Sequence, residues 1–489
     1  MRSFCLKILL FSVLMFIVAT PVLADAPFMG YSYDYWGRLI PAPAAYVPVR
    51  TFVAGDICES LGEFNNPVDI HVCADELIYI VDRDNNRIVV FDRYLNLNRV
   101  IDSFMHDGVR DTFNLPSSVF VTAHGNMYIA DTQNYRIVTL DADDNFVRMI
   151  TAPDVEGLED GFAFLPTDVV VGRSGRVLVI VARVFEGMMS FDADGEFIGY
   201  FGTIPVNASP IEILWRFFMT QEQRAQQQRF IPTEFQSMAI DQYGFILTTN
   251  LQPWASDDQV MRLNPRGDDV LVNFNDNVNI NGDQFFRPAG AWLSGPSQFI
   301  DIIARPFGKY STLDSTRGRV YTYDNEGNLL YVFSGMGTLQ GMTNRPIAIE
   351  AIGDSIMVLD EGRGRVVYFE PTEYGRLINA AIAARHIGDE AGAVNSWRQL
   401  AAIDENFSMA WVGIGRSKLA VGDNVSAMYY LTRGMDMHHY SIAFRRHRID
   451  VMHGALPGVL TGGLVLAVLI VGLKTKKWFK NRGREDEND

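Results

Sequence analysis

Between residues 46 and 370, apolar and polar residues alternate in short runs separated by Asp, Asn and Gly. Alternation with a period of two is typical of β-strands that bury one face, and the separating residues are typical of tight turns. Similar units recur at spacings of 49, 50, 66, 64 and 50 residues, marked by Pro67, Pro116, Pro166, Pro232, Pro296 and Pro346. The pattern predicts six units of four antiparallel strands each.

The six units predict a closed ring of sheets. A single unit of four short strands cannot bury its two faces, whereas radial repetition into a β-propeller buries them against neighbours. Residues 46–54 precede the first unit and resemble the last strand of other units, so we expect them to complete the sixth blade and close the ring. The predicted fold is mainly β: a six-bladed propeller over 46–370, then a small helical region and one transmembrane helix.

The units carry a motif, Asp-x-x-Asn-x-Arg-Ile, that resembles the NHL repeat, and the resemblance covers about 46–370. It implies an NHL-type propeller. In four units an Asp stands five residues before an Arg, in the pairs Asp82 and Arg87, Asp131 and Arg136, Asp314 and Arg319, and Asp360 and Arg365. A carboxylate and a guanidinium on either side of a tight turn can pair and bind its backbone, so we interpret these residues as structural.

Both ends of the chain carry membrane signals. Residues 1–24 combine two basic residues, an apolar run and a small residue at the end, which is typical of a secretory signal peptide. Residues 455–473 contain no charge and are long enough to cross a bilayer, and six basic residues follow in the tail, 474–489. We expect a single-pass type I protein of the cell membrane, with an extracytoplasmic N-terminal part and a cytoplasmic tail.

The parts of the chain expected on the two sides of this membrane differ in net charge. The whole chain has 42 basic and 58 acidic residues, a net charge of −16, and residues 25–473 alone carry about −20. Because nucleic-acid binding depends on a basic surface, this balance excludes a nucleic-acid partner. Cys58 and Cys73 are the two cysteines of the exported part, and both a disulfide and two thiols are open alternatives.

From residue 374 to about 450 the alternation stops and helical patterns begin. The sequences around Gly388 and Gly422 match at an offset of 34 residues, as do Ala393 and Ala427. A helix-turn-helix period of 34 resembles tetratricopeptide repeats. This region could bind a peptide, or could act only as a spacer between propeller and membrane.

Candidate ligand residues come from three insertions, at about 203–231, 251–259 and 275–295, all of which belong to one face of a propeller. Long loops on a rigid scaffold are where binding residues gather. Aromatic and polar side chains in these insertions would suit a carbohydrate or peptide: Trp215, Trp254, Asp257, Asp258, Asn279 and Trp292. The alternative is that they pack the insertions onto the propeller.

The sequence contains few signals of catalysis. The propeller contains His71, His106 and His124, but none at a recurring strand position, so neither a metal nor another cofactor is expected. We therefore expect a non-enzymatic binding or scaffold protein that contacts a protein partner in or at the membrane, for example as an accessory to an envelope transporter complex. The alternative is an extracytoplasmic propeller hydrolase or lyase that acts on a sugar, lactone or peptide.

Overall fold

The computed structural model describes residues 26–154, 162–202, 234–250, 259–271, 282–283 and 296–485. They divide into two compact units. The first contains residues 26–33 and the described residues between 39 and 386, and it is built mainly of strands. The second contains residues 34–38 and 387–485, and it is helical.

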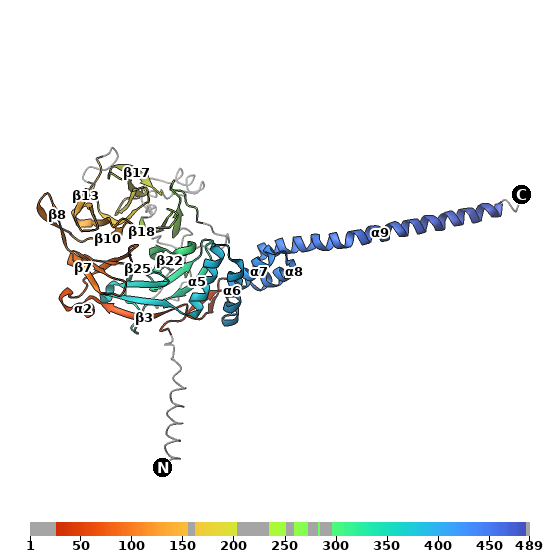
Figure 1. The fold of residues 1–489 in the computed structure, drawn as a ribbon, viewed down its shortest axis with the longest axis horizontal. Helices are drawn as coiled ribbons and strands as arrows, with labels where there is room; N and C mark the ends of the chain where they lie inside the picture. The colour runs from red at the N-terminus through yellow and green to blue at the C-terminus, as the bar shows by residue number, and fades with distance from the viewer. Residues whose placement is uncertain are drawn as a thin grey trace, which may run out of the picture. The chain divides into compact units, whose positions relative to one another are not determined.

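In the first unit, six antiparallel sheets follow one another around a ring (Figure 1). The first strands of neighbouring sheets contact each other, so they surround the axis. The sheets, called blades 1 to 6, are β4 (Pro67–Val72), β5 (Ile78–Asp82), β6 (Arg87–Phe91) and β7 (Leu97–Ile101); β10 (Ser118–Val121), β11 (Met127–Asp131), β12 (Arg136–Leu140) and β13 (Phe146–Ile150); β14 (Pro166–Val171), β15 (Val177–Val181), β16 (Met188–Phe191) and β17 (Phe197–Phe201); β18 (Phe235–Ile240), β19 (Ile246–Asn250) and β20 (Val260–Leu263); β21 (Phe299–Ala304), β22 (Tyr310–Asp314), β23 (Arg319–Tyr323) and β24 (Leu329–Phe333); and β25 (Pro346–Ile352), β26 (Ser355–Asp360), β27 (Arg365–Pro371) and β3 (Tyr46–Val53).

The ring closes between the two ends of the propeller sequence. Strand β3 pairs antiparallel with β27, so that Phe52 faces Val366 and Thr51 faces Val367. The prediction that residues 46–54 complete the sixth blade is confirmed, and so is the predicted fold class. Because β3 and β27 are more than 300 residues apart in sequence, this pairing fastens the start of the propeller to its end and removes an open sheet edge.

The apolar core lies between the blades. Separate hydrophobic clusters join blades 6 and 1, 1 and 2, 2 and 3, 3 and 4, and 4 and 5. For example, Ile80 and Phe91 of blade 1 pack in one cluster with Met357 and Leu359 of blade 6, all fully buried. Each such side chain contributes roughly 1.5–3 kcal/mol when it leaves water, so the interfaces between blades hold the ring together.

Several short elements decorate the propeller. Two hairpins, β1 (Tyr31–Tyr33) with β2 (Leu39–Pro41) and β8 (Ser103–His106) with β9 (Val109–Thr112), were not expected from the sequence. The remaining pieces are one-turn helices: α2 (Ala54–Ile57), η1 (Glu59–Leu61), η2 (Arg83–Asn85), η3 (Thr132–Asn134), η4 (Pro306–Gly308) and η5 (Glu361–Arg363).

Three of the four Asp and Arg pairs of the repeat form the expected ion pair. Their Nε–Oδ2 distances are 2.7, 2.8 and 3.2 Å, in the order of the chain: Arg87 with Asp82, Arg136 with Asp131, and Arg365 with Asp360. Each of these carboxylates also accepts a backbone N–H from the connection that precedes its blade, from Asn65, Asn114 and Asn344. The motif therefore ties the turn after the second strand to the entry of the blade.

The fourth pair is different, which corrects the expectation for Asp314 and Arg319. Arg319 Nη1 lies 2.5 Å from Asp283 Oδ2, and Asp314 faces Arg317 at 3.7 Å. Tyr31 Oη donates to the same Asp283 carboxylate at 3.0 Å, and Tyr33 Oη donates to it as well. An acidic residue from a different part of the chain has displaced the local partner of Arg319.

The two cysteines are not joined by a disulfide. Cys58 packs against the cluster between blades 6 and 1, whereas buried Cys73 belongs to the cluster between blades 1 and 2. Of the two alternatives, the structure has two thiols, since they lie in the clusters on opposite sides of blade 1.

The helices are α5 (Glu373–His386), which belongs to the first unit, and α6 (Glu390–Ile403), α7 (Ser408–Ala420), α8 (Asn424–Arg433) and α9 (Met437–Glu485), which form the second. The carboxylates of Asp389 and Asp423 cap α6 and α8 by accepting the N–H of Gly392 and Ser426. The two helix starts that lie 34 residues apart thus have the same local structure. The likeness to tetratricopeptide repeats stays a prediction.

Within the described residues, α9 is the one helix long and apolar enough to cross a membrane. Its candidate span is Met437–Trp478, with a mean hydropathy of 2.3 over the most apolar window. The predicted span 455–473 lies inside it. Pro457 stands within the helix without ending it, so the sequence before the apolar run and the run itself form one continuous helix.

Candidate functional site

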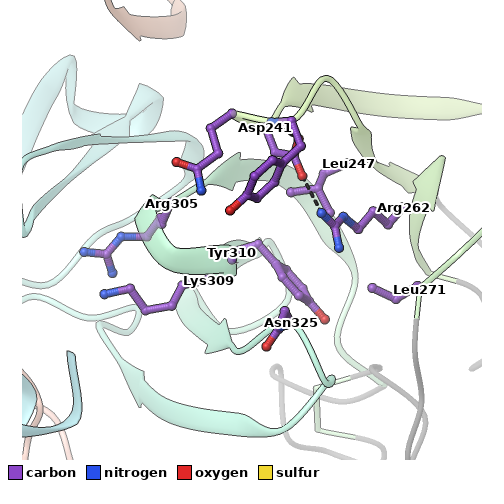
Figure 2. A pocket seen from close by; sticks show the side chains of 11 residues that line it. Asp241, Leu247, Arg262, Leu271, Arg305, Lys309, Tyr310 and Asn325 are labelled. Atoms are coloured by element: carbon purple, nitrogen blue, oxygen red, sulfur yellow. Dashed lines mark hydrogen bonds and ion pairs between the residues drawn. The ribbon is translucent and has the colours of Figure 1, made fainter. Parts of the chain in front are cut away.

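A small cavity of about 10 Å³, enough for roughly one water molecule, lies between blades 4 and 5. We call it the blade 4–5 pocket. Its lining comes mainly from the turns β18–β19, β21–β22 and β23–β24 (Figure 2). Antiparallel strands place these turns at one end of the blades, whereas the connections between blades lie at the other end. The lining residues are Asp241, Gln242, Tyr243, Leu247, Arg262, Leu271, Arg305, Gly308, Lys309, Tyr310 and Asn325.

One wall of the pocket is an ion pair beside aromatic rings. Arg262 Nη2 lies 2.6 Å from Asp241 Oδ2, and its guanidinium lies over the Phe245 ring at 4.4 Å. Tyr243 is hydrogen-bonded to His386 of α5, with 2.9 Å between Oη and Nε2. Helix α5 therefore covers part of this end of the propeller.

The opposite wall carries two buried cations. Arg305 and Lys309 flank the β21–β22 turn, and their side chains are only 4 % and 3 % exposed. Figure 2 shows the two charged ends side by side, pointing away from Arg262. Burial, and next the charge of Arg305, lower the pKa of Lys309 to about 7.

The hydroxyl of Tyr310 is a third unusual group in the lining. The ring stacks on Tyr323, with 5.4 Å between centroids, and the residue is 2 % exposed. Its Oη is buried and has no hydrogen-bond partner among the described residues. A buried hydroxyl without a partner costs about 1–3 kcal/mol, so native structures usually pair it.

A second cluster of perturbed groups surrounds the propeller axis. Asp69, Asp168 and Asp301 occupy the same position of the first strand in blades 1, 3 and 5, directly after a bulge, and Ser118 and Ser237 occupy it in blades 2 and 4. We call this set the axial belt. Burial raises the pKa of Asp69 and Asp168, and raises that of Asp301 to about 7.

Hydrogen bonds in the axial belt connect neighbouring blades. The second carboxylate oxygen of each Asp accepts the N–H of the next blade, from Val119, Met238 and Ile349 at 2.9, 2.9 and 2.6 Å. The first oxygen accepts the N–H of the following residue in its own strand at 2.8 Å. Because these oxygens are already committed, we interpret the axial belt as part of the architecture and not as a ligand site.

Two residues further along the same strands, Glu350 of blade 6 approaches His71 of blade 1. Glu350 Oε2 lies 3.6 Å from His71 Nδ1 and accepts the Val72 N–H at 3.3 Å. Burial raises the pKa of Glu350 to about 8 and lowers that of His71 to about 4. At neutral pH the two side chains therefore meet as an uncharged acid and an uncharged imidazole. His71 lies between Glu350 of blade 6 and the ring of Phe120 of blade 2.

The structure does not describe any of the ligand residues that the sequence predicted. Trp215, Trp254, Asp257, Asp258, Asn279 and Trp292 lie outside the described residues, and so do residues 1–24. The blade 4–5 pocket was missed because its residues are scattered over three turns. The axial belt could have been found from the sequence, because an Asp recurs two residues after Pro67, Pro166 and Phe299.

In the part of the chain that the structure describes, no three His, Cys, Asp or Glu side chains gather as metal ligands would. Among the described carboxylates, those of the axial belt most resemble a set of metal ligands. Their oxygens point at backbone N–H groups and serine hydroxyls, as described above, and this leaves no preformed cradle for a cation there.

One family model matches part of this chain. The NHL repeat model matches residues 64–91, which include most of blade 1. No curated protein matches the sequence. Among solved structures, virginiamycin B lyase from Staphylococcus aureus is similar with 10 % identity over 65 % of this chain and 98 % of that one, at a TM-score of 0.40.

Two more structures are similar at the same level. A streptogramin B lyase has 11 % identity over 70 % of this chain and 86 % of its own, with a TM-score of 0.38. The aldose sugar dehydrogenase of Streptomyces coelicolor, in its PQQ-bound form, has 15 % identity over 68 % of this chain and 100 % of its own, with a TM-score of 0.37. Identities this low concern the fold alone.

These neighbours correct one expectation from the sequence. We expected a protein without enzymatic activity, yet the similar propellers are a lyase, a second lyase and a dehydrogenase. The absence of a familiar catalytic motif was therefore no ground for excluding an enzyme, because a propeller can present catalytic residues from separate blades that share no local motif.

Proposed function

We propose that this protein is a membrane-anchored, extracytoplasmic binding protein that takes a small polar ligand, such as a carbohydrate or a short peptide, on the surface around exposed Tyr243, beside the blade 4–5 pocket. The observation that carries the proposal is the exposed ring of Tyr243 beside the polar and charged side chains that line this pocket. Polar groups that converge in a partly apolar concavity are typical of ligand sites.

The chemistry of the lining supports a polar ligand. Tyr243, 55 % exposed, offers an aromatic face, while Asn325 and Arg262 offer amide and guanidinium groups. Sugars and peptides present both apolar faces and hydrogen-bonding groups, so they match such a lining better than a purely apolar molecule does.

The proposed location of the propeller outside the cell rests on the signals in the N-terminal and C-terminal segments. A signal peptide in 1–24 would export the propeller, and α9 would anchor it with the basic tail inside. Protease added to intact cells should digest the propeller but leave the tail, detected by antibodies against each part. Protection of the propeller in intact cells, with digestion only after lysis, would contradict the proposed orientation.

Ligand binding is tested on the full chain in detergent micelles. We expect that some members of a panel of mono- and disaccharides and short peptides raise the unfolding temperature, and that Tyr243→Ala weakens this effect at least tenfold in concentration. Tyr94→Ala, an exposed tyrosine in a turn of blade 1, is the matched control. Chromatography of the same mixtures detects turnover, because the fold is compatible with catalysis. An unchanged response in Tyr243→Ala would contradict this location of the site.

A further inference from the structure

Helices α8 and α9 pack against each other in antiparallel directions. Leu431, toward the end of α8, shares a buried cluster with Ala443, near the start of α9. Asn424, the first residue of α8, donates from Nδ2 to Asp450 Oδ2 at 2.8 Å, further along α9. The beginning of α8 is therefore the part of that helix nearest to the apolar run of α9, and Figure 1 shows α9 continuing beyond its neighbours.

The turn between α7 and α8, residues 421–423, is held at the same level of α9. Arg446 Nη1 of α9 donates to the Leu419 carbonyl at 3.2 Å, so the end of α7 is bonded to α9. The carboxylate of Asp423 caps α8 and also accepts from Lys418 Nζ at 3.1 Å. Because both sides of the turn are bonded, the packing of three helices sets its place along α9.

This turn lies at the level of a lipid headgroup layer. The uncharged run begins at Ala455, close after Asp450 in the sequence. Five residues of an α-helix correspond to about 7.5 Å, and the headgroup region on each side of the hydrocarbon core is about 5–7.5 Å thick. When α9 crosses a bilayer with residues 455–473 in the core, the α7–α8 turn is therefore placed at the membrane surface.

The side chains exposed at this level include several apolar ones. Val421 in the turn and Val425 in the first turn of α8 are 75 % and 59 % exposed. Ile449 and Met452, at the corresponding level of α9, are exposed as well. Exposed apolar side chains that gather in one place are typical of a surface that contacts a partner or a membrane.

Positive charge accompanies these apolar groups. Arg445, Arg446 and Arg448 of α9 precede the apolar run and are exposed. A long side chain such as that of Arg448 can lay its stem on apolar surface and extend its charged end to lipid phosphates. Among the described residues, neither Arg445 nor Arg448 forms an ion pair with a carboxylate. Basic residues outside the membrane work against the rule that places them inside, so the orientation of the chain does not explain this cluster.

We propose that the α7–α8 turn and residues 445–452 of α9 dock on the anionic headgroups of the leaflet that α9 enters. In this arrangement Val421 and Val425 insert between headgroups, while Arg445 and Arg448 bind lipid phosphates. Contacts of this kind on one side of α9 set its tilt and rotation in the bilayer. The inference rests on the proposed anchoring by α9, and it does not depend on the proposed ligand site around Tyr243.

Photo-crosslinking tests the contact directly. The full chain is placed in nanodiscs of phosphatidylcholine and phosphatidylglycerol in known proportion, with the photoreactive residue benzoylphenylalanine in place of Val421. We expect phospholipid adducts, measured by mass spectrometry, at least fivefold above those formed from position Ile403. Ile403 is the matched control, because it is an exposed apolar residue at the end of α6, at the opposite end of the α6–α7 pair from the turn. Equal yields at the two positions would overturn the docking.

A third position separates this inference from the anchoring on which it rests. Leu464 lies in the middle of the apolar run, so benzoylphenylalanine there should form lipid adducts whenever α9 crosses the bilayer. Adducts at Leu464 without adducts at Val421 would leave the anchoring intact and overturn the docking. If neither position forms adducts, α9 is not in the bilayer, and both the anchoring and the docking fail.

The contribution of the arginines is measured in the same adducts. Phosphatidylglycerol should be at least twofold enriched at Val421 over its share of the bilayer, because arginines attract anionic headgroups. Arg448→Gln should at least halve this enrichment. Arg398→Gln, at an exposed position of α6, removes the same charge elsewhere and should leave it unchanged. No enrichment in the wild type, or the same enrichment in Arg448→Gln, would overturn the role of the arginines.

Val421→Asp separates docking from folding. The side chain is exposed, so the unfolding temperature in micelles should change little. In nanodiscs, the amides of residues 419–426 should exchange hydrogen at least threefold faster than in the wild type, because a carboxylate resists insertion among lipids. Ile403→Asp should leave their exchange unchanged. Equal exchange in Val421→Asp and the wild type would overturn the insertion, and if this variant is unstable in micelles, the photo-crosslinks decide.

Discussion

Ser118 of blade 2 donates its hydroxyl hydrogen to Asp168 of blade 3, with 2.7 Å between Oγ and Oδ1. Ser237 of blade 4 makes the equivalent bond to Asp301 of blade 5 at 2.5 Å. In the ring these bonds alternate with the N–H bonds that the same aspartates accept from the following blade. Polar groups at the axis thereby add hydrogen bonds between blades that apolar clusters also join.

Ser118→Ala should lower the free energy of unfolding by about 1–3 kcal/mol, because Asp168 loses a hydrogen bond in a buried setting. Ser190→Ala is a matched control: its hydroxyl is equally buried but has no described partner, so its removal should be neutral or slightly stabilising. Urea denaturation followed by tryptophan fluorescence compares the two variants. Equal effects would mean that the bond to Asp168 adds nothing.

The axial belt is interrupted at one junction. Ala348 occupies the serine position in blade 6, so no side-chain hydroxyl reaches Asp69 from that side. A348S should supply the missing bond and raise the free energy of unfolding by about 1 kcal/mol. If A348S is destabilising instead, the buried hydroxyl has found no partner and the equivalence of the three junctions is wrong. Ser118→Ala measured in the A348S background tests whether the bonds act independently.

Glu350 predicts an unusual dependence of stability on pH. Its pKa is about 8 in the folded protein, well above its ordinary value of 4.5, so between these pH values the unfolded chain loses a proton that the folded protein keeps. Stability contributed by this group is complete below about pH 4.5 and is lost as the pH rises to 8. Glu350→Gln cannot ionise and should flatten this decline.

The comparison for Glu350→Gln is best made above pH 6.5. His71, with a pKa of about 4, has the opposite sign: stability is lost as the pH falls from about 6.5 to 4. Asp301, with a pKa of about 7, acts in the same direction as Glu350. Glu370→Gln on the exposed side of β27 controls for the loss of one charge. Parallel curves for wild type and Glu350→Gln between pH 6.5 and 8 would refute the prediction.

Asp283→Asn should loosen the N-terminal hairpin. The carboxylate of Asp283 accepts from Tyr31 and Tyr33 and faces Arg317 and Arg319, and an amide in its place would turn an N–H group toward a guanidinium. We expect a loss of about 3 kcal/mol, as for a broken buried ion pair, and faster hydrogen exchange in residues 30–41. Asp92→Asn, at a solvent-facing turn of blade 1, is the control. Unchanged exchange in the hairpin would show that its contacts with Asp283 do not hold it.

The sequence by itself determined the six-bladed ring, its closure by residues 46–54, and the apolar helix near the C-terminus. Each of these follows from local signals that repeat or persist: strand alternation, turn residues at a fixed spacing, and an uncharged run long enough for a helix to cross the hydrocarbon core of a bilayer. Even the axial aspartates were visible as a recurrence after Pro67 and Pro166, although their position at the axis was not recognised.

Only the tertiary structure decided which side chains meet. Arg319 pairs with Asp283 and not with Asp314, Cys58 and Cys73 lie in separate clusters, and Lys309 is placed beside Arg305 with Asn379 of α5 as its partner. Some of these contacts join residues that are far apart in the chain. In other cases, residues that are close in the chain lie apart in the structure. Local patterns cannot encode them, because they depend on how the blades and α5 pack, and burial in that packing is also what shifts the pKa of Lys309 and Glu350.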